Sequence, residues 1–115
     1  MDRVIGIGGI FFTAQDPEAL RAWYARHLGI DVQSWGGTAF VDGGTTIWSI
    51  APAEADRPAF TVNYRVADVR ALLEALREEG CNVLDEFDES EFGKFGWVID
   101  PEGNKVELWE PPAGQ

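Results

Sequence analysis

The chain has 115 residues, enough for one hydrophobic core but not for two independent ones, so we expect a single domain over residues 1–115. With 20 acidic and 9 basic residues, its net charge of −11 makes nucleic acid and anionic membranes poor partners and favours neutral or cationic ligands. The single cysteine excludes an intrachain disulfide, and the glycine-broken N-terminal run does not resemble a signal peptide, so we expect a cytoplasmic protein.

The first half of the sequence predicts a β-α-β-β-β unit. Alternating apolar residues indicate a strand over residues 4–13. Asp16 is expected to cap a helix that begins at Pro17 and ends at Gly29, with Trp23 packed against the sheet. Three short strands should follow, over residues 31–34, 38–41 and 45–50, separated by turns at residues 36–37 and 42–44.

The second half repeats this order after an expected linker over residues 51–58. It predicts a strand over residues 59–66, a helix between Asp68 and Gly80, and strands over residues 82–87, 95–99 and 104–110. Residues 16–20 match residues 68–72, and residues 44–52 match residues 103–111 without a gap. We therefore interpret residues 4–52 and 59–111 as an internal repeat. The acidic segment 85–93 is expected to be a solvated loop or, alternatively, a flap with Phe92 and Phe95 as its apolar contacts.

The strongest local signal is the β-hairpin predicted over residues 95–111. Its loop reads DPEGN, in which Pro101 suits the first central position of a turn and Gly103 can adopt a left-handed conformation. Alternation along the second strand places Lys105, Glu107 and Trp109 on one face, and the apolar residues 106 and 108 on the other. A carboxylate between large apolar residues marks this strand as a candidate site.

The sequence resembles the vicinal oxygen chelate superfamily in three features. These are the two β-α-β-β-β units, the run D-P-E-x-L-x-x-W-Y-x-x-x-L-G that begins at Asp16, and the closing run D-P-E-G-N-x-x-E-L-W-E-P that begins at Asp100. That group includes glyoxalase I, bleomycin-resistance proteins, fosfomycin-resistance enzymes and extradiol dioxygenases. The resemblance implies an α+β fold in which two βαβββ modules form an incompletely closed, eight-stranded mixed barrel. It places the helices outside the barrel and a ligand cavity inside.

The resemblance also locates four metal-ligand positions, two in each half. Carried onto this sequence they are Gly9, Trp48, Thr61 and Glu107, of which Glu107 alone is a normal metal ligand. The sole histidine, His27, lies on the first helix, where we expect it to be packed or hydrogen-bonded. We therefore expect no bound metal and no other cofactor.

An inward-facing Glu107 would share its cavity with a set of large aromatic and polar side chains, which is the usual composition of a small-molecule site. The candidate ligand-binding residues are Phe11, Trp48, Thr61, Asn63, Arg65 and Trp109. The alternative is a satisfied internal network, in which Glu107 pairs with Arg65 or accepts a hydrogen bond from Asn63. Trp97 is expected in the core.

Three functions remain open at this point. The first is a metal-independent protein that binds a cationic or aromatic small molecule, resembling the bleomycin-resistance branch. The second is a lyase or isomerase-type enzyme with Glu107 as general acid or base. The third is a non-catalytic interaction domain, and a homodimer formed through exposed strand edges is expected.

Overall fold

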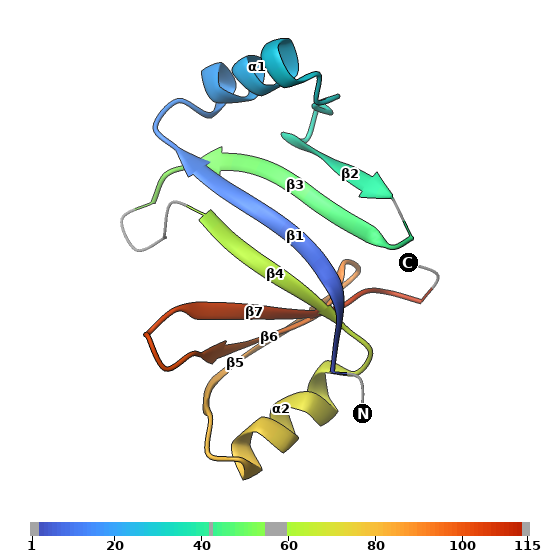
Figure 1. The fold of residues 1–115 in the computed structure, drawn as a ribbon, viewed down its shortest axis with the longest axis vertical. Helices are drawn as coiled ribbons and strands as arrows, with labels where there is room; N and C mark the ends of the chain where they lie inside the picture. Colours follow the sequence, from blue (N-terminus) through green and yellow to red (C-terminus); the bar gives the residue numbers. More distant parts are fainter. Residues whose placement is uncertain (1–2, 42, 55–59, 114–115) are drawn as a thin grey trace. The chain divides into compact units, whose positions relative to one another are not determined.

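The computed structural model describes residues 3–41, 43–54 and 60–113 (Figure 1). These residues form an α+β fold with strands in mixed pairing and two helices. In chain order the elements are β1 (Val4–Ala14), α1 (Pro17–Leu28), β2 (Gly37–Val41), β3 (Thr45–Pro52), β4 (Phe60–Val66), α2 (Val69–Glu78), β5 (Asn82–Ser90), β6 (Gly93–Ile99) and β7 (Lys105–Glu110). In the described part of the chain, no helix is long and apolar enough to cross a membrane.

The chain divides into two compact units. The N-terminal unit is Gly9–Thr61, and the C-terminal unit combines Met1–Gly8 with Val62–Gln115. In the N-terminal unit, β3 pairs in parallel with β1 and antiparallel with β2. In the C-terminal unit the strand order is β4-β7-β6-β5, with β4 parallel to β7 and the remaining pairs antiparallel.

Helix α1 begins and ends where the sequence predicts. The Asp16 side chain accepts a hydrogen bond from the Ala19 backbone N–H at 3.1 Å, and Gly29 ends the helix in the left-handed conformation, with φ of 69°. Arg21 Nε on the helix donates to the Ile50 carbonyl oxygen of β3 at 2.9 Å. This charge-assisted hydrogen bond ties α1 to β3.

The predicted packing of Trp23 is wrong, because its side chain is 49% exposed. Successive helical residues point about 100° apart, so two adjacent aromatic residues cannot both face the sheet. Tyr24 faces it instead, with its ring 5.9 Å from that of Phe12 and 5.2 Å from that of Trp48. His27 is exposed, with its ring 5.2 Å from that of Trp23.

Residues 31–34, predicted as a strand, form an irregular segment that turns into β2. The Gln33 backbone N–H donates to the Gly37 carbonyl oxygen at 2.7 Å, and the Gly36 N–H donates to the Gln33 carbonyl oxygen at 3.0 Å. These local hydrogen bonds replace the ladder that a strand would need. Seven of the eight predicted strands are therefore formed by the described residues. The incompletely closed, eight-stranded barrel stays a prediction. Residues 51 and 52 of the predicted linker belong to β3, whereas residue 42 of the predicted turn, residues 55–58 of the linker and residue 59 of the next predicted strand lie outside the described residues.

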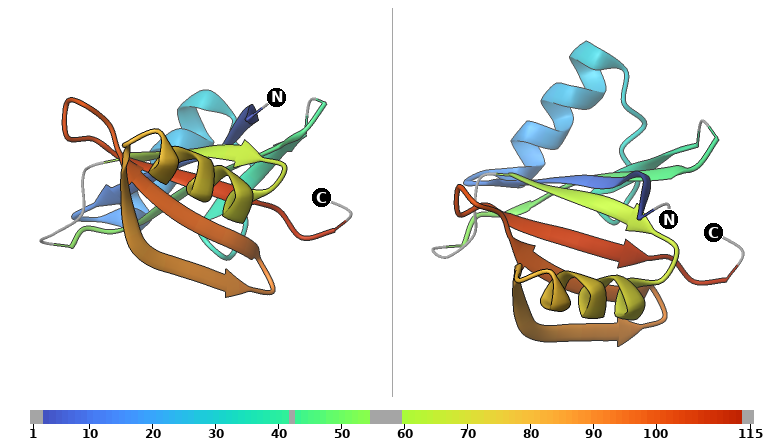
Figure 2. Two further views of the ribbon diagram at one scale, coloured as in Figure 1. Left: turned by 90° about the horizontal axis from the view of Figure 1, so that it is seen from below. Right: turned by 60° about the horizontal axis from the view of Figure 1, so that its bottom comes forward.

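The core of the C-terminal unit lies between α2 and one face of its strands (Figure 2). Asp68 caps α2 as predicted, by accepting a hydrogen bond from the Ala71 N–H at 3.1 Å. The buried core residues are Val66, Val69, Leu72, Leu73 and Leu108. Leu108 thus lies on the helix-packed face of β7, as the alternation predicts.

The acidic segment 85–93 is not the predicted solvated loop, and the alternative role as a flap stays a prediction. Strand β5 extends through Ser90 and pairs with β6, with a register irregularity between Val83 and Phe87. As the outermost strand of its unit, β5 leaves its acidic side chains exposed, and Glu89 pairs with Arg70 of α2 at 3.3 Å. Because the acidic side chains of β5 stay in solvent, they do not pay the desolvation cost of a buried carboxylate. Their low strand propensity therefore does not prevent β5 from pairing with β6.

The DPEGN hairpin is confirmed. Its loop closes through the Gly103 N–H, which donates to the Asp100 carbonyl oxygen at 3.0 Å, and Gly103 has φ of 89°. The Asp100 carboxylate also accepts hydrogen bonds from the Glu102 and Asn104 backbone N–H groups and from the Asn104 side chain, each at 2.9 Å. These bonds, that of the Asn104 side chain foremost, hold the pKa of Asp100 below its ordinary value.

The lowered pKa predicts an acid-dependent contribution of Asp100 to stability. A carboxyl group whose folded pKa is depressed stabilises the fold above its unfolded pKa of about 3.9, and this contribution is lost as the pH falls through the lower folded pKa. Asp100→Asn should therefore lower the free energy of unfolding at pH 7 and converge with the wild type in acid. Urea denaturation from pH 7 to pH 2 measures this difference, and a gap that stays constant across the range would contradict the assignment.

Candidate functional site

The face of the C-terminal unit that points away from α2 carries the candidate site. Direct partners across β4 and β7 are Asn63 with Glu107 and Arg65 with Trp109. Across β6 and β7, Phe95 pairs with Trp109 and Trp97 with Glu107, and directly paired residues share a face. We call this set the Glu107 face; it consists of Asn63, Arg65, Phe95, Trp97, Lys105, Glu107 and Trp109.

A hydrogen bond between two side chains lies at the centre of this face. Asn63 Nδ2 donates to Glu107 Oε2 at 2.9 Å, and Asn63 is 1% exposed. Because an ionised carboxylate only accepts hydrogen bonds, this contact fixes which end of the amide faces Glu107. Asn63 Oδ1 is buried without a hydrogen-bond partner among the described residues. The hydrogen bond from Asn63, predicted as part of an internal network, is thus confirmed.

Gly8 on β1 makes room for the Asn63 amide. A Cβ atom at this position would collide with Asn63 Oδ1 and would lie 2.7 Å from Trp109 Cε3. The buried backbone of Gly8 therefore packs directly against both site residues. Sequence reasoning missed this role, because nothing in a glycine-rich run says which glycine faces a buried side chain.

Trp109 is buried and held on two sides. Its Nε1–H donates to the Phe92 carbonyl oxygen at 2.8 Å, which satisfies the indole donor. Its ring stacks with that of Phe95, with centroids 6.2 Å apart and an interplanar angle of 13°. The β5–β6 turn therefore fixes the orientation of Trp109.

Trp97 lies on the Glu107 face rather than in the predicted core beneath α2. It is half-buried, and Lys105 Nζ lies 5.4 Å from its ring centroid, within the range of a cation–π interaction. Extending the alternation of Glu107 across the DPEGN loop to its partner strand would have identified Trp97. The same extension identifies Phe95, which is also half-buried.

Arg65 reaches across to the backbone of β1. Its Nη1 donates to the Ile7 carbonyl oxygen at 3.3 Å, and its guanidinium group lies against Gly6. Lys105 contacts Glu86 Oε1 at 3.5 Å, and Lys94 contacts Glu110 Oε2 at 3.7 Å. Arg65 and Lys105 on the Glu107 face, and Lys94 on the opposite face of β6, are thus engaged with acceptors of their own.

Three candidate ligand-binding residues belong to the N-terminal unit. Phe11 is half-buried on β1, and Thr61 is half-buried on β4. Trp48 is buried, with its ring 6.0 Å from that of Phe12 and 5.2 Å from that of Tyr24. Trp48 therefore lies on the side of β3 that faces α1. The roles of Phe11, Trp48 and Thr61 in ligand binding stay predictions.

The strand registers shift the correspondence between the two halves by one residue. Phe11 pairs with Ser49, and Asn63 pairs with Glu107. Phe11 and Asn63 stand at the same distance before the aspartates that cap α1 and α2. Ser49, and not Trp48, therefore occupies the position that corresponds to Glu107, and a one-residue shift in a strand reverses the face of a side chain.

The cause of this shift is the different length of the two hairpin loops. Val41 pairs with Thr45 around the first loop, whereas Ile99 pairs with Lys105 around the second. An alignment that matches the glycines of the two loops without a gap therefore displaces β3 by one residue relative to β7. The sequence does not reveal this displacement, because either alignment of β3 with β7 places apolar residues of β3 on the side that faces α1.

The residues at the four family positions do not fit a divalent metal. Gly9 has no side chain, Thr61 and Ser49 offer hydroxyl groups, and Glu107 supplies a single carboxylate, whereas a catalytic metal needs about three strong protein ligands. Within residues 3–41, 43–54 and 60–113, no group of three His, Cys, Asp or Glu side chains is placed to hold a metal ion.

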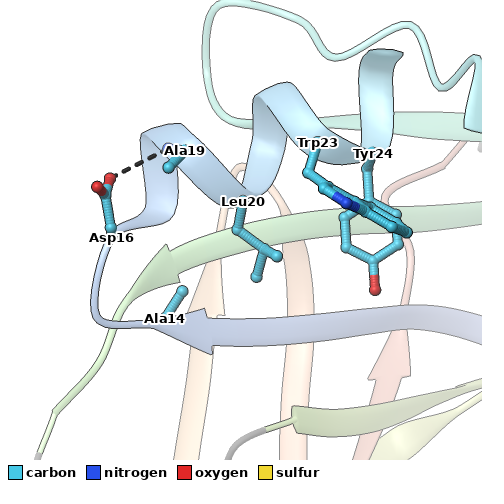
Figure 3. Close-up of a pocket in the computed structure, with 6 residues that line it drawn as sticks. All are labelled: Ala14, Asp16, Ala19, Leu20, Trp23 and Tyr24. Carbon is cyan, nitrogen blue, oxygen red and sulfur yellow. Dashed lines mark hydrogen bonds between the residues drawn. The ribbon is translucent and has the colours of Figure 1, made fainter. Parts of the chain in front are cut away.

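Two surface hollows are lined by other residues than those predicted. An open groove of about 530 Å³ runs under α1, and Figure 3 shows Leu20 and Tyr24 pointing from the helix toward the strands. It is lined by Ala14, Asp16, Ala19, Leu20, Trp23 and Tyr24. A second hollow of about 340 Å³ lies between α2 and β5, and Arg70, Arg77 and Glu86 are among its lining residues. Neither hollow contains a candidate ligand-binding residue.

Comparison with known proteins identifies the domain. A family model described as a glyoxalase-like domain matches residues 9–109. No curated protein matches the sequence significantly.

Solved structures show the same fold at low sequence identity. Methylmalonyl-CoA epimerase from Mycobacterium tuberculosis is 20% identical, with a TM-score of 0.73 over 97% of this chain and 91% of that chain. Methylmalonyl-CoA epimerase in complex with methylmalonyl-CoA and NH4+ is also 20% identical, with a TM-score of 0.72 over 97% of each chain. NAD-dependent benzaldehyde dehydrogenase from Legionella pneumophila is 12% identical, with a TM-score of 0.65 over 90% of this chain and 98% of that chain. Such different activities on one fold show that the fold alone does not give the reaction.

The packing of Gly8 predicts a sharp difference between two glycines of β1. Gly8→Ala should destabilise the protein by about 1–3 kcal/mol, because its Cβ meets the buried Asn63 amide and the Trp109 ring. Gly6→Ala is the matched control, since its Cβ meets the end of the flexible Arg65 side chain, which can move away. Chemical denaturation measures both changes, and equal losses in the two variants would contradict the tight packing at Gly8.

Proposed function

Because the chain belongs to the glyoxalase-like domain family, we propose that its Glu107 face binds a small organic molecule without the help of a divalent metal. The observation that carries this proposal is the Asn63–Glu107 hydrogen bond of 2.9 Å. It holds a half-buried carboxylate in one orientation on a face that α2 does not cover. A positioned charge of this kind has no role in the core packing of the unit.

The surroundings of Glu107 support binding of an organic group. Trp97 pairs directly with Glu107, and the half-buried Phe95, whose ring stacks on that of the buried Trp109, continues the aromatic surface along β6. Aromatic walls with a few oriented polar groups are typical of small-molecule sites. Metal independence is supported by the donor set, in which Glu107 is the one strong ligand among the four family positions. The exposed thiol of Cys81 is consistent with the proposed cytoplasmic location.

Proton transfer by Glu107 is the second candidate function. The hydrogen bond from Asn63 engages Oε2 and fixes the carboxylate, and a fixed carboxylate beside a bound carbonyl compound is a competent general base. An isomerase among the solved structures with this fold supports the same reaction class. The net charge of −11 disfavours a polyanionic CoA ester, so we propose a smaller and less anionic substrate.

Binding at the Glu107 face predicts a specific loss in one tryptophan variant. Soluble aromatic fragments should give a saturable change in tryptophan fluorescence, and Trp97→Leu should weaken binding at least about tenfold, because it removes a wall of the site. Trp35→Leu, which removes an exposed tryptophan of the N-terminal unit, is the control and should leave the affinity unchanged. A chelator should have no effect. No saturable response from any fragment, or equal losses in the two variants, would refute the proposed site.

A separate prediction tests catalysis. If Glu107 transfers protons, the protein should speed the exchange of the α-hydrogen of short 2-methyl-3-oxo thioesters in D2O, and Glu107→Gln should slow this exchange by about 10²–10⁴-fold. Proton NMR follows the exchange directly. Glu102→Gln, which removes an exposed carboxylate in the loop of the same hairpin, serves as control. Equal exchange rates in the wild type and Glu107→Gln would exclude the acid–base role and leave binding as the function.

A further inference from the structure

A cation from the chain itself already lies against the Glu107 face. The Lys105 ammonium group is 5.4 Å from the centroid of the Trp97 ring, and Trp97 is the direct strand partner of Glu107. Because side chains of directly paired residues lie side by side, the aromatic ring and the carboxylate form neighbouring walls for a positive charge. An aromatic face beside an anionic group is the usual composition of a site for an organic cation.

Lys105 is held loosely in this place. Its side chain is 46% exposed, and its ion pair with the exposed Glu86 is 3.5 Å long. Exposed ion pairs of this kind contribute little to stability, because solvent screens them and two flexible side chains must be ordered. Another cation can therefore displace the Lys105 ammonium group from Trp97 at small cost.

Arg65 and Lys94 are engaged with other acceptors and do not compete with Lys105 for the Trp97 ring. Arg65 donates to the Ile7 carbonyl oxygen at 3.3 Å, and Lys94 pairs with Glu110 at 3.7 Å. The net charge of −11 adds a field that draws cations to the protein. One Glu107 oxygen is engaged by Asn63, so the carboxylate offers its charge in a fixed position.

We propose that Trp97 and Glu107 form a binding site for an organic cation with a quaternary or tertiary ammonium head group, and that Lys105 fills this site when no ligand is bound. The proposal rests on the proposed small-molecule site and names its ligand class. A quaternary head group competes well with Lys105, because it is weakly hydrated and loses less solvation on an indole ring than a primary ammonium group does. The ligand body then extends toward the half-buried Phe95, the next residue of the Glu107 face along β6.

A matched pair of ligands tests the charge requirement. Choline and its neutral isostere 3,3-dimethyl-1-butanol have nearly the same shape and differ in the positive charge. We expect choline to bind saturably, as followed by tryptophan fluorescence and calorimetry, at least about fivefold more tightly than the isostere. Trp97→Leu should abolish choline binding, and Glu107→Gln should weaken it about two- to fivefold.

Lys105 provides the decisive variant. Lys105→Gln removes the internal competitor and should raise the affinity for choline about two- to fivefold. Lys94→Gln changes the net charge by the same amount on the neighbouring strand but leaves the Trp97 ring covered, so it controls for the overall field. Equal gains in the two variants would show that net charge alone attracts the ligand and would overturn the proposal.

The outcomes separate this inference from the proposed function. If the neutral isostere binds as tightly as choline and Trp97→Leu abolishes both, the cation site is wrong and the small-molecule site stands. If choline and the uncharged aromatic fragments all fail to bind, the small-molecule site falls as well. Binding of choline alone, enhanced by Lys105→Gln, supports both.

Discussion

The period-two alternation of β7 is the constraint on which the C-terminal unit depends. Leu108 points into the core beneath α2, and its neighbours Glu107 and Trp109 necessarily point to the opposite face. A shift of one residue would bury the carboxylate under the helix and expose Leu108, at a cost in both apolar burial and charge desolvation. The same packing that stabilises the unit therefore also positions the candidate site.

Local chemistry made much of the fold predictable. Asp16 and Asp68 cap helices where the sequence says they should, and the DPEGN loop forms its hairpin. Helix caps and turns are determined by residues that are close in the sequence, so they do not depend on how distant parts of the chain pack. The segment 31–34 and the acidic strand β5 were misjudged for the opposite reason: whether a short polar segment joins a sheet depends on partners distant in the sequence.

Part of the candidate site was predicted from the sequence, whereas the places of Trp97 and Trp48 were not. Glu107 and Trp109 follow from alternation along β7, whose register with β6 is fixed by the hairpin loop, whereas Asn63 on β4 was reached through the family resemblance. Trp97 follows from the same rule, but its apolar character favoured a core position. Trp48 was matched to Glu107 across loops of unequal length, and the register gives that place to Ser49. An internal repeat identifies equivalent strands more reliably than equivalent residues.

Among the four positions that the family resemblance assigns to metal ligands, Glu107 alone carries a strong ligand, and this bears on what the glutamate can do. In a metal centre the charge of such a carboxylate is neutralised by the cation that it binds. Here the partner of Glu107 is the neutral Asn63 amide, which orients the carboxylate without cancelling its charge. Trp97 beside it adds the negative face of an indole ring, and the chain as a whole is strongly acidic. Each of these features favours a cation at this face, which supports the proposed site for an organic cation.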